Sequence, residues 1–292
     1  MYVVPPAIAV HPFCCRWKQS HRWIRSMAKY PESDEYYQKN AGKFWDKFYK
    51  RHKNKFFKDR HYLEKDWGQY FSDYAHSASG KIVLEVGCGA GNTIFPLIAA
   101  FPKLYVQACD ISPHAVALVK SHAEFTEDRV NAFVCDVTVD SLLEHIKPSS
   151  VDVITLVGVL ELYNSGVSDP AISPYRMPWI LQNVKRVLKM VMFSCEITLL
   201  EILHNHASFC CCMFSTYKVK LENKNQMISD GFYVRGDGTC SFYFSEDFLS
   251  TLFFQAGFRT VDISTYCKQI KNCHKNITMD RRWIRAVFNN LE

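Results

Sequence analysis

The first half of the chain alternates short apolar runs with stretches whose apolar residues recur at helical spacing. Each run has the length of a buried strand, and the first three end at a glycine or an aspartate. The runs lie at 81–86, 105–109, 131–135 and 151–157, and the helical stretches after them lie at 92–100, 112–122, 141–146 and 177–188. This order predicts a parallel sheet with helices on both faces.

The second half of the chain is less regular. Residues 190–217 are apolar and rich in cysteine, and they show no clear period. Regular patterns return beyond residue 231, with a strand at 240–244, a capped helix at 245–256 and strands at 260–266 and 284–288. We expect the last two strands to form a late, antiparallel part of the sheet.

A helical segment with an aromatic face precedes the sheet. The aromatic residues that recur at helical spacing are Phe44, Trp45, Phe48 and Tyr49. Trp45 and Tyr49 are four apart and share one face, either as a lid over a ligand or as a core stripe against the sheet. We divide the chain into a leader at 1–40, expected to be disordered, a helical segment at 41–76 and an α/β domain at 77–292, within which 190–224 is atypical.

The composition is that of a globular protein. With 292 residues, 48% hydrophobic and 22% charged, the chain can bury a sizeable core without disulfides. The twelve cysteines show no paired CxxC spacing, so we expect reduced thiols and no metal site. No uninterrupted apolar run of about 18 residues occurs, so we expect no transmembrane helix. The acid-poor start of the chain is typical of an organelle transit peptide or of a disordered basic leader.

Positive charge is concentrated in one place. The net charge is +6, and residues 43–65 are both basic and densely aromatic. That combination suits a polyanion that also offers flat rings for stacking, which favours a nucleic acid as the partner.

Three strand ends carry residues suited to a nucleotide-like ligand. In a parallel sheet, ligands bind beyond the carboxyl ends of the strands. Gly87–Gly91 follows the first strand, and glycines let the backbone approach a ligand closely. Asp110 ends the second strand, where a carboxylate can accept ribose hydroxyls, and Asp136 ends the third, within reach of an adenine amino group. The spacing GxGxG after Glu85 favours S-adenosylmethionine over NAD or FAD, and the alternative role for each aspartate is a helix cap.

Several strings resemble one family, the tRNA 3-methylcytidine methyltransferases. The most specific are FFKDRH at 56–61 and FYVRGDGT at 232–239. The others are WDKFYK at 45–50, EVGCGAGN at 85–92, ACDISP at 108–113, CDV at 135–137, NVKRVLK at 183–189 and FSEDFL at 244–249. Together they cover roughly residues 41–189 and 226–288.

The resemblance implies a fold, a reaction and a set of contacts. The fold would be a Rossmann-like class I methyltransferase, with a mostly parallel seven-stranded sheet, helices on both faces and an N-terminal helical substrate-binding extension. The reaction would be methyl transfer from S-adenosylmethionine to N3 of cytidine 32 in the anticodon loop of a tRNA. The helper would be seryl-tRNA synthetase, as in one branch of the family, or another tRNA-associated protein. We expect a cytoplasmic protein, with nuclear or organellar placement as alternatives. By matching position, cofactor contacts would come from Trp45, Tyr49, Gly87, Asp110, Asp136, Val137 and Val157.

The chemistry suggests further roles. Cytosine N3 carries a free lone pair, so positioning of the base dominates over proton removal. The product is cationic, so a carboxylate at Asp59 or Asp237 would stabilise it. We expect phosphate contacts from Lys55, Lys58, Arg60 and Arg235, with a solvated charged face as the alternative.

Two segments depart from the family pattern. Residues 161–171 look like an insertion, and 190–224 lack the Pro-Gly turn and the Arg-Asp-Tyr strand that family members carry after the NVKRVLK motif. These departures put the fifth strand in doubt. They also keep open a non-catalytic tRNA- or synthetase-binding module, beside a methyltransferase acting on a small molecule or a protein.

Overall fold

The computed structural model describes residues 40–72, 80–156, 176–189, 209–215, 227–229, 232–234, 240–242, 244–272 and 277–290. Three of the expected site residues, Val157, Arg235 and Asp237, lie outside the described residues. Residues 1–39 of the leader, the segment 161–171 and most of 190–224 lie outside them as well.

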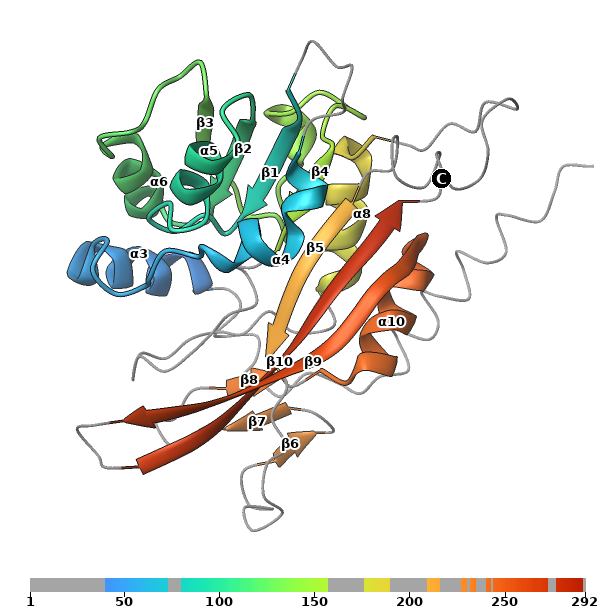
Figure 1. Ribbon diagram of the computed structural model, residues 1–292. Coiled ribbons are helices and arrows are strands. Elements are labelled where there is room, and N and C mark those ends of the chain that lie inside the picture. The colour runs from blue at the N-terminus through green and yellow to red at the C-terminus, as the bar shows by residue number, and fades with distance from the viewer. Residues whose placement is uncertain are drawn as a thin grey trace, which may run out of the picture.

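A mixed sheet forms the centre of the fold, with strand order β3-β2-β1-β4-β5-β10-β9 (Figure 1). Neighbouring strands from β3 to β5 pair in parallel, whereas β10 runs antiparallel to both β5 and β9. The strands are β1 (Ile82–Val86), β2 (Tyr105–Asp110), β3 (Val130–Val134), β4 (Val153–Thr155), β5 (Phe209–Ser215), β9 (Phe258–Asn272) and β10 (Ile277–Asn290). The chain moves outward from β1 to β3 and then returns to β4 beside β1, which creates the switch point where such sheets bind ligands.

Strand β1 shows why the strands of the sheet appear in the sequence as runs of apolar residues. Val83 belongs to the core on one face, while Leu84 and Val86 belong to the core on the other. Both faces are covered, so every residue of β1 except Glu85 is apolar, and Glu85 is itself buried. The helices are α3 (Ala41–His52), α4 (Tyr62–Phe71), α5 (Ile94–Ala100), α6 (Pro113–Lys120), α8 (Met177–Val187) and α10 (Glu246–Gln255), with a short 3-10 helix η1 (Leu142–Glu144). The parallel sheet with helices on both faces is therefore confirmed.

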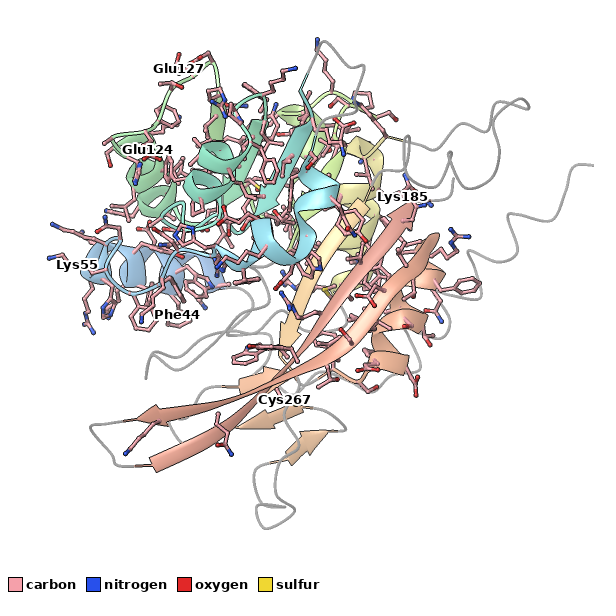
Figure 2. The ribbon with its side chains drawn as sticks, in the orientation of Figure 1. Phe44, Lys55, Glu124, Glu127, Lys185 and Cys267 are labelled. Atoms are coloured by element: carbon pink, nitrogen blue, oxygen red, sulfur yellow. The ribbon has the colours of Figure 1, made fainter. Side chains whose placement is uncertain are left out.

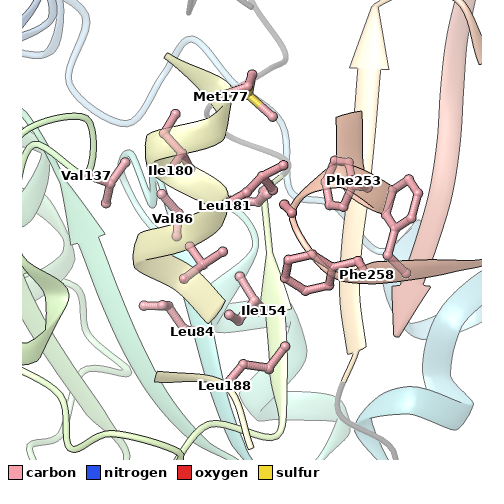
Figure 3. Close-up of a cluster of buried hydrophobic side chains, with 14 of the residues drawn as sticks. Leu84, Val86, Val137, Ile154, Met177, Ile180, Leu181, Leu188, Phe253 and Phe258 are labelled. Carbon is pink, nitrogen blue, oxygen red and sulfur yellow. The ribbon is translucent and has the colours of Figure 1, made fainter. Parts of the chain in front are cut away.

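The two cores use different helices. Helices α4, α5 and α6 pack on the Val83 face, and α8 and α10 pack on the other. Figure 3 shows Leu84 and Val86 beneath Ile180 and Leu181 of α8, with Phe253 close by. Full burial of one such side chain stabilises the fold by about 1.5–3 kcal/mol.

Two helix starts follow the sequence signals. Ser112 Oγ accepts a hydrogen bond from Ala115 N at 3.2 Å, and Pro113 occupies the first turn of α6. Ser245 Oγ caps α10 by accepting from Phe248 N at 3.2 Å. Gly257 then ends α10 with a φ of 86°, a conformation that suits glycine.

The fifth strand exists, contrary to the doubt raised by 190–224. Residues 209–215 form β5, which lies between β4 and β10 in the sheet. The stretch at 240–244 is a strand too, but Cys240–Phe242 (β8) joins a separate small sheet with β6 (Met227–Ser229) and β7 (Phe232–Val234). The expected strands at 260–266 and 284–288 are longer than predicted, and they form the β9–β10 hairpin whose far end projects past the rest of the sheet (Figure 1).

Arg285 of β10 fastens α4 to the sheet. Its guanidinium lies 5.4 Å from the ring centre of Tyr62, 5.3 Å from that of Trp67 and 5.3 Å from that of Tyr266. It also forms an ion pair with Asp66. These contacts hold the N-terminal segment against the sheet, next to the site described below.

Two further features of the described residues are the character of their helices and the state of their thiols. Within them, no helix has the length and apolar character needed to cross a membrane. Cys88, Cys109 and Cys135 are buried thiols without a disulfide, and Cys267 is an exposed one.

Candidate cofactor site

The loop after β1 turns back over the end of β2. Gly87 N and Cys88 N both donate to the carbonyl oxygen of Cys109, at 2.8 and 3.0 Å. Gly89 has a φ of 53° and Gly91 a φ of 91°, values that other residues adopt with strain. The loop therefore presents bare backbone at the carboxyl end of the sheet.

Asp110 joins this loop to the one after β2. Its carboxylate accepts from Gly89 N at 2.9 Å and from Ser112 N at 2.8 Å. Burial raises the pKa of Asp110 to about 6, against the opposing effect of these backbone donors. A carboxylate has about four acceptor positions, so capacity remains for hydroxyl groups of a ligand.

Asp136 lies at the end of β3, as expected, and its turn is fixed locally. Its Oδ1 accepts from Thr138 N at 3.0 Å and from Thr138 Oγ1 at 2.6 Å. Arg176, just before α8, donates to the same Thr138 hydroxyl at 2.8 Å. Val137 is buried in the core beside this turn. The cap-like bonding that we considered as an alternative is thus present, and the adenine contact stays a prediction.

Helix α3 lies across both loops (Figure 1). The rings of Trp45 and Tyr49 stack with centroids 5.9 Å apart, so they do share one face. A methyl group added at Gly89 would come within 2.5 Å of the Tyr49 hydroxyl, and one added at Gly42 within 3.3 Å of the Ile111 side chain. The expected lid and the expected core stripe are compatible here, because Tyr49 is buried and also contacts the glycine loop.

Asp46 is a site residue that sequence reasoning missed. Its Oδ1 accepts from Ser112 Oγ at 3.0 Å and from His114 N at 3.0 Å. Partial burial acts to raise the pKa of Asp46, but hydrogen bonds from His114 and Ser112 outweigh it and lower the pKa. The available signal was one acid within a basic helix, on the face that also carries Tyr49.

The FFKDRH motif forms a loop that is tied to the end of the glycine loop. Arg60 N donates to the carbonyl oxygen of Asn92 at 2.9 Å. Asn92 Nδ2 donates to Asp59 Oδ1 at 3.0 Å and to the carbonyl oxygen of Phe57 at 3.2 Å. Asp59 is therefore tied to the residue that follows Gly91, and its role beside the target base stays a prediction.

The phosphate contact expected of Arg60 is not supported. Arg60 is only 9% exposed, and its Nη1 donates to Thr93 Oγ1 at 3.2 Å. A buried guanidinium needs such partners, so its charge holds the motif on the glycine loop. Lys55 and Lys58 are exposed, and Figure 2 shows Lys55 at the edge of the molecule.

The two phenylalanines of the motif pack inward. The ring centres of Phe56 and Phe57 lie 5.0 and 5.8 Å from that of Phe48 in α3. They belong to the small core beneath this helix, as the commoner use of such rings predicts. Among the described residues, no three His, Cys, Asp or Glu side chains gather where they could hold a metal ion.

Comparison with known proteins adds sequence and fold relatives. A family model described as "Methyltransferase domain" matches residues 84–190. The chain is similar to tRNA N(3)-cytidine methyltransferase METTL6 of Rattus norvegicus, with 35% identity over 86% of this chain and 80% of the relative. It is also similar to a tRNA(Thr) (cytosine(32)-N(3))-methyltransferase of Saccharomyces cerevisiae, with 29% identity over 93% of this chain and 41% of the relative.

Solved structures share the fold. A SAM-dependent methyltransferase from Methanosarcina mazei matches with a TM-score of 0.51 over 75% of this chain and 99% of that chain. The two are 15% identical in sequence, so this likeness bears on the fold alone. The glycine loop and Asp110 lie at the carboxyl ends of β1 and β2, the edge at which parallel sheets bind ligands.

Proposed function

We propose, because this chain belongs to the family of tRNA N(3)-cytidine methyltransferases, that it transfers a methyl group from S-adenosylmethionine to N3 of a cytidine in tRNA. One observation carries the proposal: the aromatic, basic segment is fastened directly to the glycine loop. Tyr49 reaches Gly89, and Arg60 reaches Thr93. A segment suited to RNA and a loop suited to the cofactor therefore border one site.

The residues present fit this cofactor. When bound, S-adenosylmethionine supplies a methyl group on a positively charged sulfur. Asp110, at the end of β2, accepts the ribose hydroxyls, and Asp136, at the end of β3, accepts from the adenine amino group. The stacked rings of Trp45 and Tyr49, on α3, cover the cofactor at the strand ends and shield it from water.

The chain's task in the reaction is positioning. Cytosine N3 attacks with its own lone pair, so no general base is needed and alignment in line with the methyl group sets the rate. The base must leave its stack to reach the pocket. Asp59, held by Asn92 beside the glycine loop, stabilises the cationic product, and Asp237 is the second candidate for this role.

The RNA contact uses the exposed lysines of the same segment. Lys55 and Lys58 pair with phosphates of the tRNA backbone. The target we propose is cytidine 32 of the anticodon loop. The Saccharomyces cerevisiae relative, whose name specifies cytosine 32, supports this choice. Seryl-tRNA synthetase is the proposed helper, and the cytoplasm is the proposed compartment.

A methyl-transfer assay tests the proposal. The purified protein is incubated with S-adenosylmethionine labelled on the methyl group and total tRNA, with and without seryl-tRNA synthetase. We expect label in tRNA, and none with Asp110→Ala. Label in a protein or small-molecule fraction but not in tRNA would contradict the RNA substrate. Cofactor binding and tRNA binding without transfer would establish the non-catalytic module instead.

A further inference from the structure

One carboxylate joins the capping helix α3 to the start of α6. Asp46 Oδ1 lies 3.0 Å from Ser112 Oγ, 3.0 Å from His114 N and 2.7 Å from His114 Nδ1. These groups belong to the cap and first turn of α6, where backbone N–H groups have no partner within the helix. The carboxylate therefore also faces the positive end of the α6 dipole.

Helix α3 is otherwise basic, so the carboxylate of Asp46 determines whether α3 is attracted to the start of α6 or repelled by it. Asp46 is its one acidic residue, and its charged neighbours along the helix are Lys43, Lys47, Lys50 and Arg51. Without the carboxylate, a positively charged helix would face the positive end of another helix. Removing Asp46 thus deletes the hydrogen bonds and adds repulsion between α3 and α6.

The same contact reaches the ribose-binding carboxylate through one residue. Ser112 Oγ donates to Asp46, while Ser112 N donates to Asp110 Oδ1 at 2.8 Å. Gly42 packs on Ile111, the residue between Asp110 and Ser112 in the sequence. These contacts therefore fix the position of helix α3 relative to the loop that carries Asp110.

We propose that Asp46 is a positioning residue for the cofactor: it seats α3 on the start of α6, so that the rings of Trp45 and Tyr49 cover the bound cofactor. Asp46 follows Trp45 directly and precedes Tyr49 by one helical turn, so its anchor fixes both the place and the rotation of the two rings. This inference rests on the proposed function, because it takes the cofactor to lie at the strand ends.

A positioning role and a purely structural role have different signatures. Loss of the anchor lets α3 leave the pocket, so the cofactor dissociates faster, while the strand-end loops that align it remain in place. The KM for S-adenosylmethionine therefore rises and kcat at saturating cofactor is maintained. Loss of folded protein would instead lower kcat and leave KM unchanged.

The test compares Asp46→Ala, Asp46→Asn, His114→Ala and the control Lys47→Ala in the full-length protein. The probe is S-adenosylhomocysteine, titrated by calorimetry, followed by KM and kcat for S-adenosylmethionine with tRNA. Lys47 is exposed on the same helix, so its variant changes charge without touching the anchor. Circular dichroism checks that each variant is folded.

We expect Asp46→Ala to weaken S-adenosylhomocysteine binding by about tenfold, the size expected for losing hydrogen bonds to a charged group. Asp46→Asn keeps an acceptor oxygen for Ser112 and His114 N but loses the negative charge, so it should recover only part of that loss. Lys47→Ala should bind as the wild type does, and His114→Ala should lie between the two Asp46 variants.

Two results would overturn the inference: wild-type affinity in folded Asp46→Ala, or a fall in kcat at constant KM. If Asp46→Ala does not fold, the comparison of Asp46→Asn and His114→Ala with wild type decides, and wild-type affinity in both refutes the anchor. A wild-type protein that fails to bind S-adenosylhomocysteine refutes the proposed function itself.

Discussion

Replacing Gly89 by alanine tests the contact between the capping helix and the glycine loop. The added methyl group would lie 2.5 Å from the Tyr49 hydroxyl and 3.3 Å from Cζ of the same ring. The φ of Gly89 is 53°, and this left-handed backbone conformation costs a residue other than glycine about 1–2 kcal/mol of conformational energy. The variant therefore strains the loop and pushes the ring away at the same time.

The two costs can be separated by their magnitude and by a second substitution. Moving Tyr49 disturbs its stacking on Trp45 and its edge contact with Phe48, each worth about 0.5–1.5 kcal/mol. We expect Gly89→Ala to weaken S-adenosylhomocysteine binding by at least about tenfold, since 1.4 kcal/mol is a factor of ten. In Gly89→Ala with Tyr49→Phe, the hydroxyl is gone and the nearest ring atom is the one at 3.3 Å.

Calorimetric titration of the wild type, both single variants and the double variant completes a double-mutant cycle. The backbone cost is the same with either residue at position 49, so the cycle isolates the clash. We expect the double variant to bind more tightly than Gly89→Ala alone, with a coupling energy of about 1 kcal/mol or more. Additive effects, within about 0.5 kcal/mol, would show that Tyr49 does not cover this loop.

Three other predictions follow from the charged residues of the site. Because burial raises the pKa of Asp110 to about 6, its contribution to folding is present below its unfolded pKa of 3.8 and is lost as pH rises through 6. Denaturation at several pH values should show this fall in wild type but not in Asp110→Asn, and S-adenosylhomocysteine affinity should rise over the same window because the ionised form accepts the ribose hydroxyls. Lys58→Ala should weaken tRNA binding and reduce the slope of log affinity against log salt concentration by about one, as measured by salt titration. Arg60→Ala should mainly lower the free energy of unfolding, by about 1.5–3 kcal/mol, as measured by urea unfolding. Asp59→Asn should slow the single-turnover rate at normal tRNA affinity, and an unchanged rate would remove this carboxylate from the mechanism.

The strand ends were predictable because local rules govern them. Short apolar runs that end at Gly87 and at Asp110 predict buried parallel strands with polar groups at one edge of the sheet. The spacing of Trp45 and Tyr49 likewise placed both on one helix face. The positions of these residues in the structure follow from the same rules.

Strand β5 was hidden for a physical reason. It lies inside the sheet between β4 and β10, and strands in that position read as continuous apolar runs without alternation. Such a run has no period that distinguishes a strand from a buried helix. The departure of 190–224 from the family pattern then removed the remaining clue.

Contacts between residues far apart in the sequence account for the roles of Arg60 and Asp46 that the sequence does not predict. The exposed basic residues around Arg60 predict a phosphate contact, yet its partner Thr93 lies at the start of α5. The role of Asp46 is not visible in the sequence, because its partners Ser112 and His114 lie far along the chain. Sequence spacing reports neighbours within a helix, whereas these pairings arise only when α3 and the FFKDRH loop fold onto the sheet.

Nucleoside analysis of methylated tRNA tests the central claim most directly. Unmodified tRNA transcripts are incubated with the purified protein and S-adenosylmethionine, with seryl-tRNA synthetase added in a parallel sample, then digested and analysed by mass spectrometry against nucleoside standards. We expect 3-methylcytidine as the new product, absent with Asp110→Ala and lost when cytidine 32 is replaced by uridine. A different methylated nucleoside, or none in either sample while both cofactor and tRNA bind, would contradict the account.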